Sequence, residues 1–387
     1  MNNYFQYVHN LKGVSRFEKF KPATQIAITS YFIRQLEDLN ALENNIVSES
    51  NAEVLSYIAE HLDLKTYYKS IILTTSKSSY VEEVDFNNVR AIINLRQVNH
   101  IQRPNKLFRS VNTLLPSGGL YIGTLETYGD RKVHIYNTIG QNYFGRFLWL
   151  VDFLLHRVIP RIPYLEKLYY YLTDGQLHAI SEAEVLGRLV YCGFDIIDIR
   201  SINGLSYFAV MKTKKPVEHQ HPTYYPIIKL NRLGKNGKMI GVYKFRTMHP
   251  YSEYIQDYLV RLHGYNKKGK PARDFRVTRW GKLFRKLWID EFPQLINVLK
   301  GEMKLVGLRP LSRVRFEEFP EDIKAERLKY KPGCIPPYVA LNMPDDKENI
   351  EAERIYINDL RAHPKTTDIR YFLMAVYNIL TNKIRSS

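Results

Sequence analysis

Two adjacent carboxylates, Asp290 and Glu291, are the side chains of this sequence best placed for nucleophilic chemistry. They fall in a joint between two helical patterns. The first pattern, residues 279–289, places apolar side chains on one arc and cations on the opposite arc at about 100° per residue. The second begins at Pro293, because proline is tolerated in the first turn of a helix, and ends near Gly301. Backbone N–H groups and the dipole at a helix N-terminus stabilise negative charge, so we expect Asp290 to stay ionised and to act as a nucleophile.

Four cations with apolar neighbours accompany this joint: Lys244, Arg246, Arg285 and Arg309. A diphosphate repels a carboxylate nucleophile, so a site that attacks a diphosphate must first neutralise charge with clustered cations or a metal. In the alternative interpretation, Asp290 only caps the second helix and its neighbour is solvated. The accompanying cations favour an anion site that contains a nucleophile.

Three stretches, in this order, resemble the bacterial sugar transferase family, the monotopic phosphoglycosyl transferases that begin polysaccharide or glycan assembly on a polyprenyl phosphate. They are YKFRTM at 243–248, FRVTRWGKLFRKLWIDEFPQLINVLKGEMKLVGLRP at 275–310 and KPG at 331–333. The resemblance covers the chain from about residue 225 to its end. It implies that the Asp of the Asp-Glu pair attacks the β-phosphate of a nucleotide diphosphate sugar, in particular a UDP-sugar, and releases the nucleoside monophosphate. A polyprenyl phosphate such as undecaprenyl phosphate then takes the phosphosugar from the enzyme.

The resemblance also implies a role for each matching residue. By the family pattern Asp290 is the nucleophile, Glu291 helps to hold Mg²⁺, and Arg285 and Arg309 bind phosphate. Lys331 stands where the family often has arginine, and lysine keeps the charge but loses the two-pronged hydrogen bonding of a guanidinium.

The sequence departs from the family pattern at two places. Leu308 replaces the proline before the last arginine of the family's Gly-Pro-Arg-Pro, which is a minor change. The Thr-Gly that usually follows Pro-Gly-x is replaced in PGCIPPY at 332–338, so the substrate contacts expected near Pro332 are in doubt.

A β-hairpin is predicted to present two of the cations. Residues 226–230 and 239–248 alternate like paired strands across NRLGKNGK, whose Asn-Gly is a strong turn signal. Lys244 and Arg246 project from one face of the second strand and form a candidate phosphate clamp. The alternative is a solvated sheet face.

Two further segments flank the predicted catalytic elements. Residues 251–273 contain a Tyr-rich helix and a loop, KKGKPARD, suited to a mobile lid. Asp274 and Arg276 follow this loop and are candidates for contacts to the nucleotide. The C-terminal stretch 368–385 is an amphipathic helix candidate that either lies on a bilayer surface or packs in the core.

The first half of the chain predicts an α/β domain. Strand-like stretches at 70–75, 89–95, 120–125, 194–199 and 205–211, with helical patterns between them, resemble the later half of a class I methyltransferase, a Rossmann-like fold. Such an enzyme needs a Gly-rich turn after its first strand, and no glycine occurs between Gly13 and Gly118. We therefore predict a degenerate scaffold or partner-binding domain at 1–211, a linker at 212–224, and a smaller α+β catalytic domain with amphipathic helices at 225–387.

An apolar insertion interrupts the first domain at 144–172, FGRFLWLVDFLLHRVIPRIPYLEKLYYYL. It is broken by prolines, flanked by Arg146, Arg157, Arg161 and Lys167, and rich in aromatic residues. These features suit a hairpin that dips into one leaflet of a membrane. A helical hairpin packed on its own domain or on a dimer partner is the alternative.

Composition bounds the remaining possibilities. The 387 residues carry a net charge of +17, of which +13 lies in residues 216–387, which fits anionic lipid, nucleic acid or a phosphorylated substrate. No nucleic-acid-binding module is recognisable, so a nucleic-acid-binding protein and a methyltransferase remain the weaker alternatives.

The two cysteines form no disulfide framework, and the first residues lack a secretory signal. With the resemblance, this predicts an enzyme on the cytoplasmic face of the bacterial inner membrane, monotopic or peripheral, with a homodimer as one arrangement.

Overall fold

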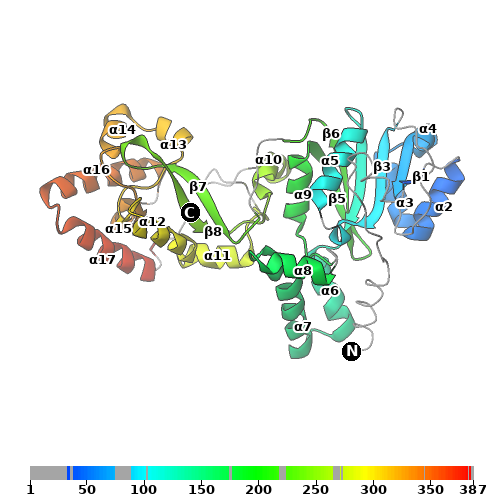
Figure 1. The fold of residues 1–387 in the computed structure, drawn as a ribbon, viewed down its shortest axis with the longest axis horizontal. Coiled ribbons are helices and arrows are strands. Elements are labelled where there is room, and N and C mark those ends of the chain that lie inside the picture. Colours follow the sequence, from blue (N-terminus) through cyan, green and yellow to red (C-terminus); the bar gives the residue numbers. More distant parts are fainter. Residues whose placement is uncertain are drawn as a thin grey trace. The chain divides into compact units, whose positions relative to one another are not determined.

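The computed structural model describes residues 33–34, 38–74, 89–101, 103–173, 177–217, 224–264, 271, 273–343, 345–381 and 383–384. The chain forms two compact units (Figure 1). The first contains Met1–Tyr224 and His249–Asp274, and the second contains Tyr225–Met248 and Phe275–Ser387. Residues 249–274, which the sequence placed within a continuous C-terminal domain, therefore group with the first unit.

A six-stranded sheet organises the first unit, in the order β1-β2-β3-β4-β6-β5. β2, β3 and β4 are parallel, whereas β6 runs antiparallel to both β4 and β5. The mixed sheet with its parallel core confirms the predicted α/β class. β2 to β6 lie where the sequence placed them, whereas the short β1 was not predicted. The strands are β1 (Ile33–Arg34), β2 (Ile71–Thr74), β3 (Ala91–Gln97), β4 (Leu120–Leu125), β5 (Phe194–Ile202) and β6 (Leu205–Lys212).

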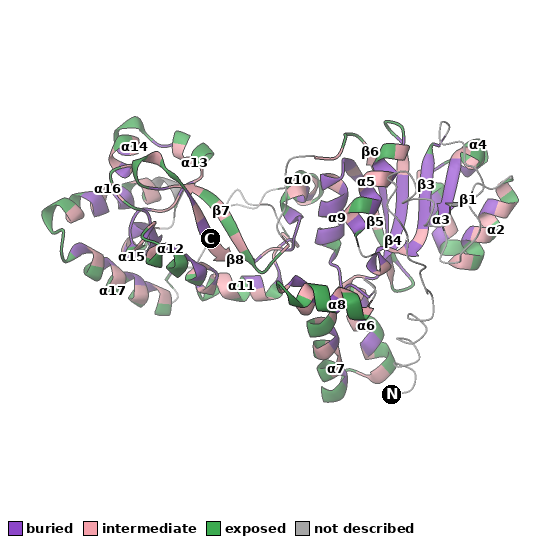
Figure 2. Cartoon of the chain, in the orientation of Figure 1, coloured by how far each residue is buried: buried purple, intermediate pink, exposed green. Residues whose placement is uncertain are grey.

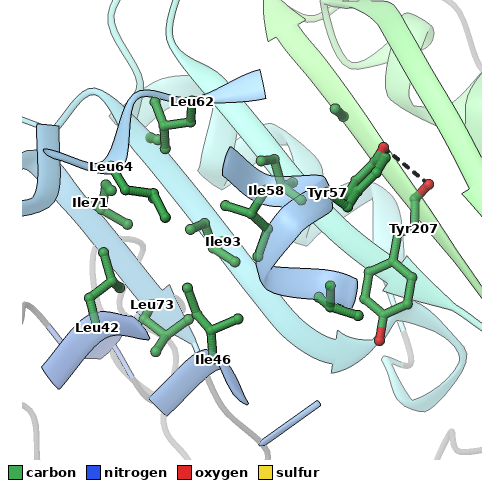
Figure 3. Packing of buried hydrophobic residues seen from close by; sticks show 14 of the residues in the cluster. Leu42, Ile46, Tyr57, Ile58, Leu62, Leu64, Ile71, Leu73, Ile93 and Tyr207 are labelled. Carbon is green, nitrogen blue, oxygen red and sulfur yellow. Dashed lines mark hydrogen bonds between the residues drawn. The ribbon is translucent and has the colours of Figure 1, made fainter. Parts of the chain in front are cut away.

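Helices cover this sheet and bury its apolar side chains. Leu42 and Ile46 from one helix and Ile58 from the next pack on the strand residues Leu73 and Ile93 (Figure 3). These side chains are almost completely excluded from water, which is the main favourable contribution to folding. The helical elements are α2 (Leu39–Glu49), α3 (Ala52–His61), α4 (Leu64–Tyr67), η2 (Tyr68–Ser70), η4 (Val98–His100), α5 (Pro104–Leu114), α6 (Tyr128–Ile139) and α9 (Glu182–Tyr191).

Helix α9 begins at a serine cap. The hydroxyl of Ser181 accepts a hydrogen bond from the Glu184 N–H, at 3.2 Å, as an N-cap. The buried carboxylate of Glu184 is engaged by three guanidinium groups. These belong to Arg157, Arg161 and Arg188, at 2.6, 2.6 and 2.8 Å.

The predicted lid segment is instead fixed to the first unit over its first half. η8 (Ser252–Ile255) and α10 (Gln256–His263) follow Tyr251, which has a left-handed backbone with φ 62° and is buried. The Tyr251 hydroxyl contacts the Asn105 side chain at 2.7 Å, and the Arg188 guanidinium lies 4.3 Å from the centre of its ring. Arg261 pairs with Asp195 at 2.7 Å. Most of the KKGKPARD loop lies outside the described residues.

The apolar insertion is a helical segment packed on its own unit. It consists of α7 (Tyr143–Phe153), a π-helical turn η5 (Leu154–Val158), η6 (Ile159–Arg161) and α8 (Leu165–Thr173). Arg157 and Arg161, expected to flank a membrane hairpin, are buried against Glu184, so this part of the expectation is wrong. Many side chains of α7 and α8 are nevertheless exposed (Figure 2).

The second unit combines a two-stranded hairpin, a short parallel pair and helices. β7 (Ile227–Leu233) and β8 (Met239–Phe245) pair antiparallel across η7 (Lys235–Gly237), as predicted for NRLGKNGK. β9 (Lys304–Val306) pairs parallel with β10 (Gly333–Ile335). The helices are α11 (Arg279–Lys286), η9 (Ile289–Gln294), α12 (Leu295–Leu299), α13 (Arg313–Glu317), α14 (Glu321–Arg327), α15 (Pro337–Leu341), α16 (Asp346–Ala362) and α17 (Thr367–Leu380).

The C-terminal amphipathic stretch forms α17, which packs in the core with one side and is exposed on the other. Tyr371 and Ala375 are fully buried in the core of the second unit, whereas Leu373 and Tyr377 are exposed. Within the described part of the chain, no helix is both long and apolar enough to cross a membrane. His219 and His221 of the predicted linker lie outside the described residues.

Candidate active site

The Asp-Glu pair lies in a tight joint between α11 and α12, as the sequence predicted. Thr278 caps α11, its hydroxyl accepting from the Gly281 N–H at 2.9 Å. Trp288 then adopts a left-handed backbone with φ 58°, which ends the helical direction of α11. Asp290 and Glu291 occupy the first turn of the 3₁₀-helix η9, which continues into α12. The joint is thus a short 3₁₀ turn and not a second α-helix that starts at Pro293.

Asp290 has an unusual environment for a carboxylate. Its side chain is buried, with 5% of the residue exposed, and its Oδ1 atom has no hydrogen-bond partner. An unpaired carboxylate oxygen away from water is costly, so such atoms in native structures call for an explanation.

Strand β8 supplies a cation to the neighbouring carboxylate. Lys244 Nζ makes an ion pair with Glu291 Oε1. The two elements are held together by Asn297 of α12, whose side chain donates to the Gly241 carbonyl at 2.8 Å and accepts from the Tyr243 N–H at 3.1 Å. Because Asn297 is completely buried, these bonds fix the spacing between β8 and the joint.

Two arginines extend the positive charge around Glu291. Burial raises the pKa of Glu291, and the charge of Asp290 adds to this, whereas Lys244 and Arg309 oppose it. Burial also lowers the pKa of Arg232, with a further contribution from the charge of Arg309. Lys244, Arg232 and Arg309 therefore share one electrostatic neighbourhood with the two carboxylates.

The backbone of Arg309 is held on both sides by a buried ion pair. Its N–H donates to Glu353 Oε1 at 3.3 Å, and its carbonyl oxygen accepts from Arg327 Nη2 at 2.6 Å. Arg327 and Glu353 pair with each other, and both are buried. The Arg309 guanidinium lies 5.6 Å from the centre of the Tyr338 ring. α14 and α16 thus position a cation at the site.

The remaining predicted residues have separate partners. Arg285 Nε donates to Thr247 Oγ1 at 3.0 Å. β8 ends before Arg246, whose Nε donates to the Tyr225 carbonyl at 3.0 Å, so the structure holds it apart from the Lys244 ion pair. Lys331 is exposed, with its Nζ beside Gly301.

The two candidate nucleotide contacts fall in different units. Asp274 is the last residue of the first unit and is half-buried. Arg276 is buried in the second unit.

The donor set at the joint suits Mg²⁺ coordinated partly by substrate. Mg²⁺ usually binds one or two protein carboxylates and completes its shell with water and phosphate oxygens. Glu291, half-buried beside Lys244, provides such a carboxylate. Over the described residues, no cluster of three or more His, Cys, Asp or Glu side chains could form an all-protein metal site.

Sequence reasoning missed Arg232, Asn297, Arg327 and Glu353. Arg232 stands in a turn-like stretch where a cation is ordinarily solvated, and Asn297 stands in an apolar helical pattern. Arg327 and Glu353 are far from Arg309 along the chain, and only the tertiary packing of α14 and α16 brings them to it. An asparagine inside an otherwise apolar pattern was the one usable signal.

Comparison with known proteins gives a consistent result for the second half of the chain. The family model of bacterial sugar transferases matches residues 205–382. The galactosyl transferase CpsE of Streptococcus agalactiae serotype III is 36% identical over 158 residues, which are 40% of this chain and 34% of that protein.

Two further relatives carry more specific names. An undecaprenyl-phosphate galactose phosphotransferase of Salmonella typhimurium is 39% identical over 108 residues, or 26% of this chain and 22% of the relative. The UDP-N-acetylgalactosamine-undecaprenyl-phosphate N-acetylgalactosaminephosphotransferase of Aeromonas hydrophila is 44% identical over 93 residues. These residues are 24% of this chain and 20% of that protein.

The matched segments span about a third or less of these three relatives. The range matched by the family model includes the Asp-Glu joint and the surrounding cations. Residues 205–382 therefore resemble the bacterial sugar transferase family.

Proposed function

We propose that this protein transfers a phosphosugar from a nucleotide diphosphate sugar to polyprenyl phosphate, with release of the nucleoside monophosphate. The observation that carries the proposal is the buried Asp290, with an unpaired oxygen, beside Glu291 and the cations Lys244, Arg232 and Arg309. The names of two relatives support undecaprenyl phosphate as acceptor, and one of them supports a UDP-sugar as donor.

The reaction proceeds in two displacements on the same phosphorus. In the first, an oxygen of Asp290 bonds to the β-phosphorus, and the bond to the bridging oxygen of the α-phosphate breaks, so the nucleoside monophosphate leaves with that electron pair. In the second, an oxygen of polyprenyl phosphate bonds to the phosphorus of the aspartyl phosphosugar. The carboxylate of Asp290 leaves, and the product is a lipid diphosphate sugar.

Each surrounding side chain has a defined task in these steps. Lys244 and Arg309 offset the charge of the diphosphate before attack, which lowers the electrostatic barrier. Mg²⁺ held through Glu291 would neutralise the phosphate oxygens further. Arg285, Arg246 and Lys331 are proposed to bind other phosphate oxygens of the two substrates, and Asp274 and Arg276 the nucleotide.

We also propose a place and a scaffold for this reaction. The polyprenyl acceptor puts the enzyme at a membrane surface, on the cytoplasmic face of the bacterial inner membrane where sugar nucleotides are found. The order and direction of β2, β3, β4, β6 and β5 support a methyltransferase-like, Rossmann-like scaffold for the first unit. Its lack of glycine between Gly13 and Gly118 supports a scaffold that does not bind S-adenosylmethionine.

The test is a panel of sugar nucleotides incubated with membranes and polyprenyl phosphate, followed by measurement of nucleoside monophosphate. We expect release with at least one nucleotide sugar and formation of a lipid-linked sugar. Asp290→Asn should abolish both while its unfolding midpoint stays close to that of the unchanged protein. Full turnover by Asp290→Asn would rule out the proposed nucleophile.

A further inference from the structure

The helical segment α7–α8 of the first unit carries an outward apolar surface. Of the 16 large hydrophobic residues that are exposed in the described part of this unit, 11 lie within residues 143–172. On α7, Tyr143, Phe147 and Leu150 follow the i, i+4, i+7 spacing of one helical stripe, and Leu154 of η5 continues it. On α8, Leu168 and Leu172 form the corresponding exposed stripe.

The polarity of α7 is the reverse of that of a helix on the surface of a water-soluble domain. Its acidic residue, Asp152, points inward and is 4% exposed. There it accepts two hydrogen bonds from Arg131, at 2.6 Å each, in a bidentate ion pair. The charged side chain is thus inside and the apolar stripe outside.

Buried ion pairs hold this orientation in place. Removing one partner of a buried, bidentate pair leaves an uncompensated charge, so α7 cannot rotate to bury its stripe without breaking the Arg131–Asp152 pair. Arg157 and Arg161 fix the following turn against Glu184 in the same way. The apolar exposure is therefore built into the fold.

The fully exposed charged side chains of this segment are all positive. Among residues 143–172, the exposed charged side chains are Arg146 and Lys167, and the two acidic residues are buried or half-buried. Lys132 of α6 lies 4.7 Å from the centre of the Trp149 ring. Aromatic and aliphatic side chains bordered by cations complement the interface of an anionic bilayer, with headgroup phosphates beside the cations.

The helical segment is too short to cross a bilayer. Residues 143–158 of α7 and η5 extend about 24 Å at ~1.5 Å per residue, less than the ~30 Å hydrocarbon thickness of a bilayer. With a charged inner side and an apolar outer side, the segment is suited to lie along one interface. We propose that the outer surface of α7–α8 binds the surface of an anionic phospholipid bilayer.

This inference does not rest on the transferase activity. It assigns a membrane contact to the first unit, outside the catalytic half of the chain. A bilayer-bound first unit would keep the covalently linked second unit near a lipid-borne acceptor.

The test uses the full chain and phosphatidylglycerol-containing vesicles in a sedimentation assay. The double variant Phe147→Glu with Leu168→Glu should lower vesicle binding by at least about tenfold, because it places carboxylates in the interface. Ile197→Glu, an exposed apolar position of the same unit on β5, is the matched control and should bind as the unchanged protein does. Equal vesicle binding by the double variant and the control would overturn the proposal.

Two further measurements separate other outcomes. A fluorophore on Phe147→Cys should become shielded from water when vesicles are added, and the native cysteines are buried and will not compete. A different outcome is that the unchanged protein is a dimer without lipid while the double variant is a monomer with unchanged vesicle binding. In that case a second copy of the chain covers the α7–α8 surface, and the proposal is wrong. The double variant should still release nucleoside monophosphate with detergent-dispersed acceptor, whereas Asp290→Asn should still bind vesicles.

Discussion

At the scale of single residues, the two adjacent carboxylates of the site have different environments. Asp290 is buried, and one of its carboxylate oxygens accepts no hydrogen bond. Glu291, in contrast, forms an ion pair with the ammonium group of Lys244. Adjacent carboxylates with unlike environments are typical of sites where one group reacts and the other holds charge. The proposed division into nucleophile and metal ligand follows from this difference.

Lys244→Ala tests the electrostatic part of this arrangement. We expect KM for the sugar nucleotide to rise by roughly tenfold to a hundredfold, the effect of losing one charge-assisted hydrogen bond. Lys244 lowers the pKa of Glu291, so its removal should raise that pKa further. Because Glu291 must be ionised to hold a metal, the acid limb of the kcat/KM profile should move to higher pH.

Lys238→Ala is the matched control, since Lys238 is an exposed lysine of the same hairpin. Its pH profile and KM should equal those of the unchanged enzyme. An unshifted acid limb in Lys244→Ala would contradict the role given to Glu291.

The ion pair that holds the backbone of Arg309 makes a separate prediction. Arg327→Ala leaves the buried carboxylate of Glu353 without its cation, so the free energy of unfolding should fall by about 3–5 kcal/mol. Denaturant unfolding measures this. Arg354→Ala removes an exposed partner of Asp322 and should change stability little. Equal effects of the two changes would show that the buried pair has no special role.

At the scale of elements, local signals in the sequence located the joint and most strands, although not the 3₁₀ turn that forms the joint. Pro293 and Gly301 marked the second helical stretch, and Asn236-Gly237 marked the turn of the β7–β8 hairpin. Period-two and apolar patterns placed the strands of the first sheet. These features depend on the conformational preferences of a few neighbouring residues, and such preferences can be predicted from the residue types alone.

The features that could not be predicted depend on contacts between distant segments. Nothing local indicates that Tyr251 packs on α9, or that Asp152 turns inward to meet Arg131. A helical pattern does not specify which face will meet a buried partner. The sequence therefore predicted a Tyr-rich helix after residue 251 but not its docking on the first unit. The left-handed Trp288 was not expected, because this backbone conformation is rare for bulky residues.

Gly281→Ala tests the packing of α11 on the hairpin segment. A Cβ at this position would clash with the Thr247 carbonyl oxygen and lie 2.7 Å from Thr278 Oγ1. We expect α11 to shift, the Arg285–Thr247 hydrogen bond to weaken, and stability to fall by about 1–3 kcal/mol. Thermal and denaturant unfolding, together with turnover, report the change.

Gly241→Ala provides a control in the same unit. There the new Cβ meets only the flexible side chain of Lys229, which can move away. This variant should fold and turn over normally. If Gly281→Ala does the same, the close approach of α11 to Thr247 is not required for the site.

At the scale of the whole molecule, the two units should respond differently to acid. Burial, reinforced by neighbouring arginines, lowers the pKa of His100 to about 4, and of His178 and His249 to about 3. All three belong to the first unit. Below their ordinary pKa of about 6.5, the unfolded chain binds protons that the folded chain does not, so stability falls as pH falls.

The expected loss is about 1.4 kcal/mol per pH unit for each histidine between roughly pH 6.5 and 4.5. Hydrogen exchange, corrected for intrinsic rates, should show peptides of β3 and β4 losing protection over this range. Peptides of α16 and α17 in the second unit should lose much less. Protection of β3 and β4 that is independent of pH would contradict the burial of neutral histidines.

The central claim is that Asp290 forms a covalent bond to phosphorus. Enzyme mixed with its sugar nucleotide in the absence of polyprenyl phosphate, quenched and digested, should yield a peptide containing Asp290 with the added mass of a phosphosugar. Asp290→Asn should yield none, and added polyprenyl phosphate should remove the adduct from the unchanged enzyme. Rapid turnover without any adduct on this peptide, together with activity in Asp290→Asn, would contradict the account.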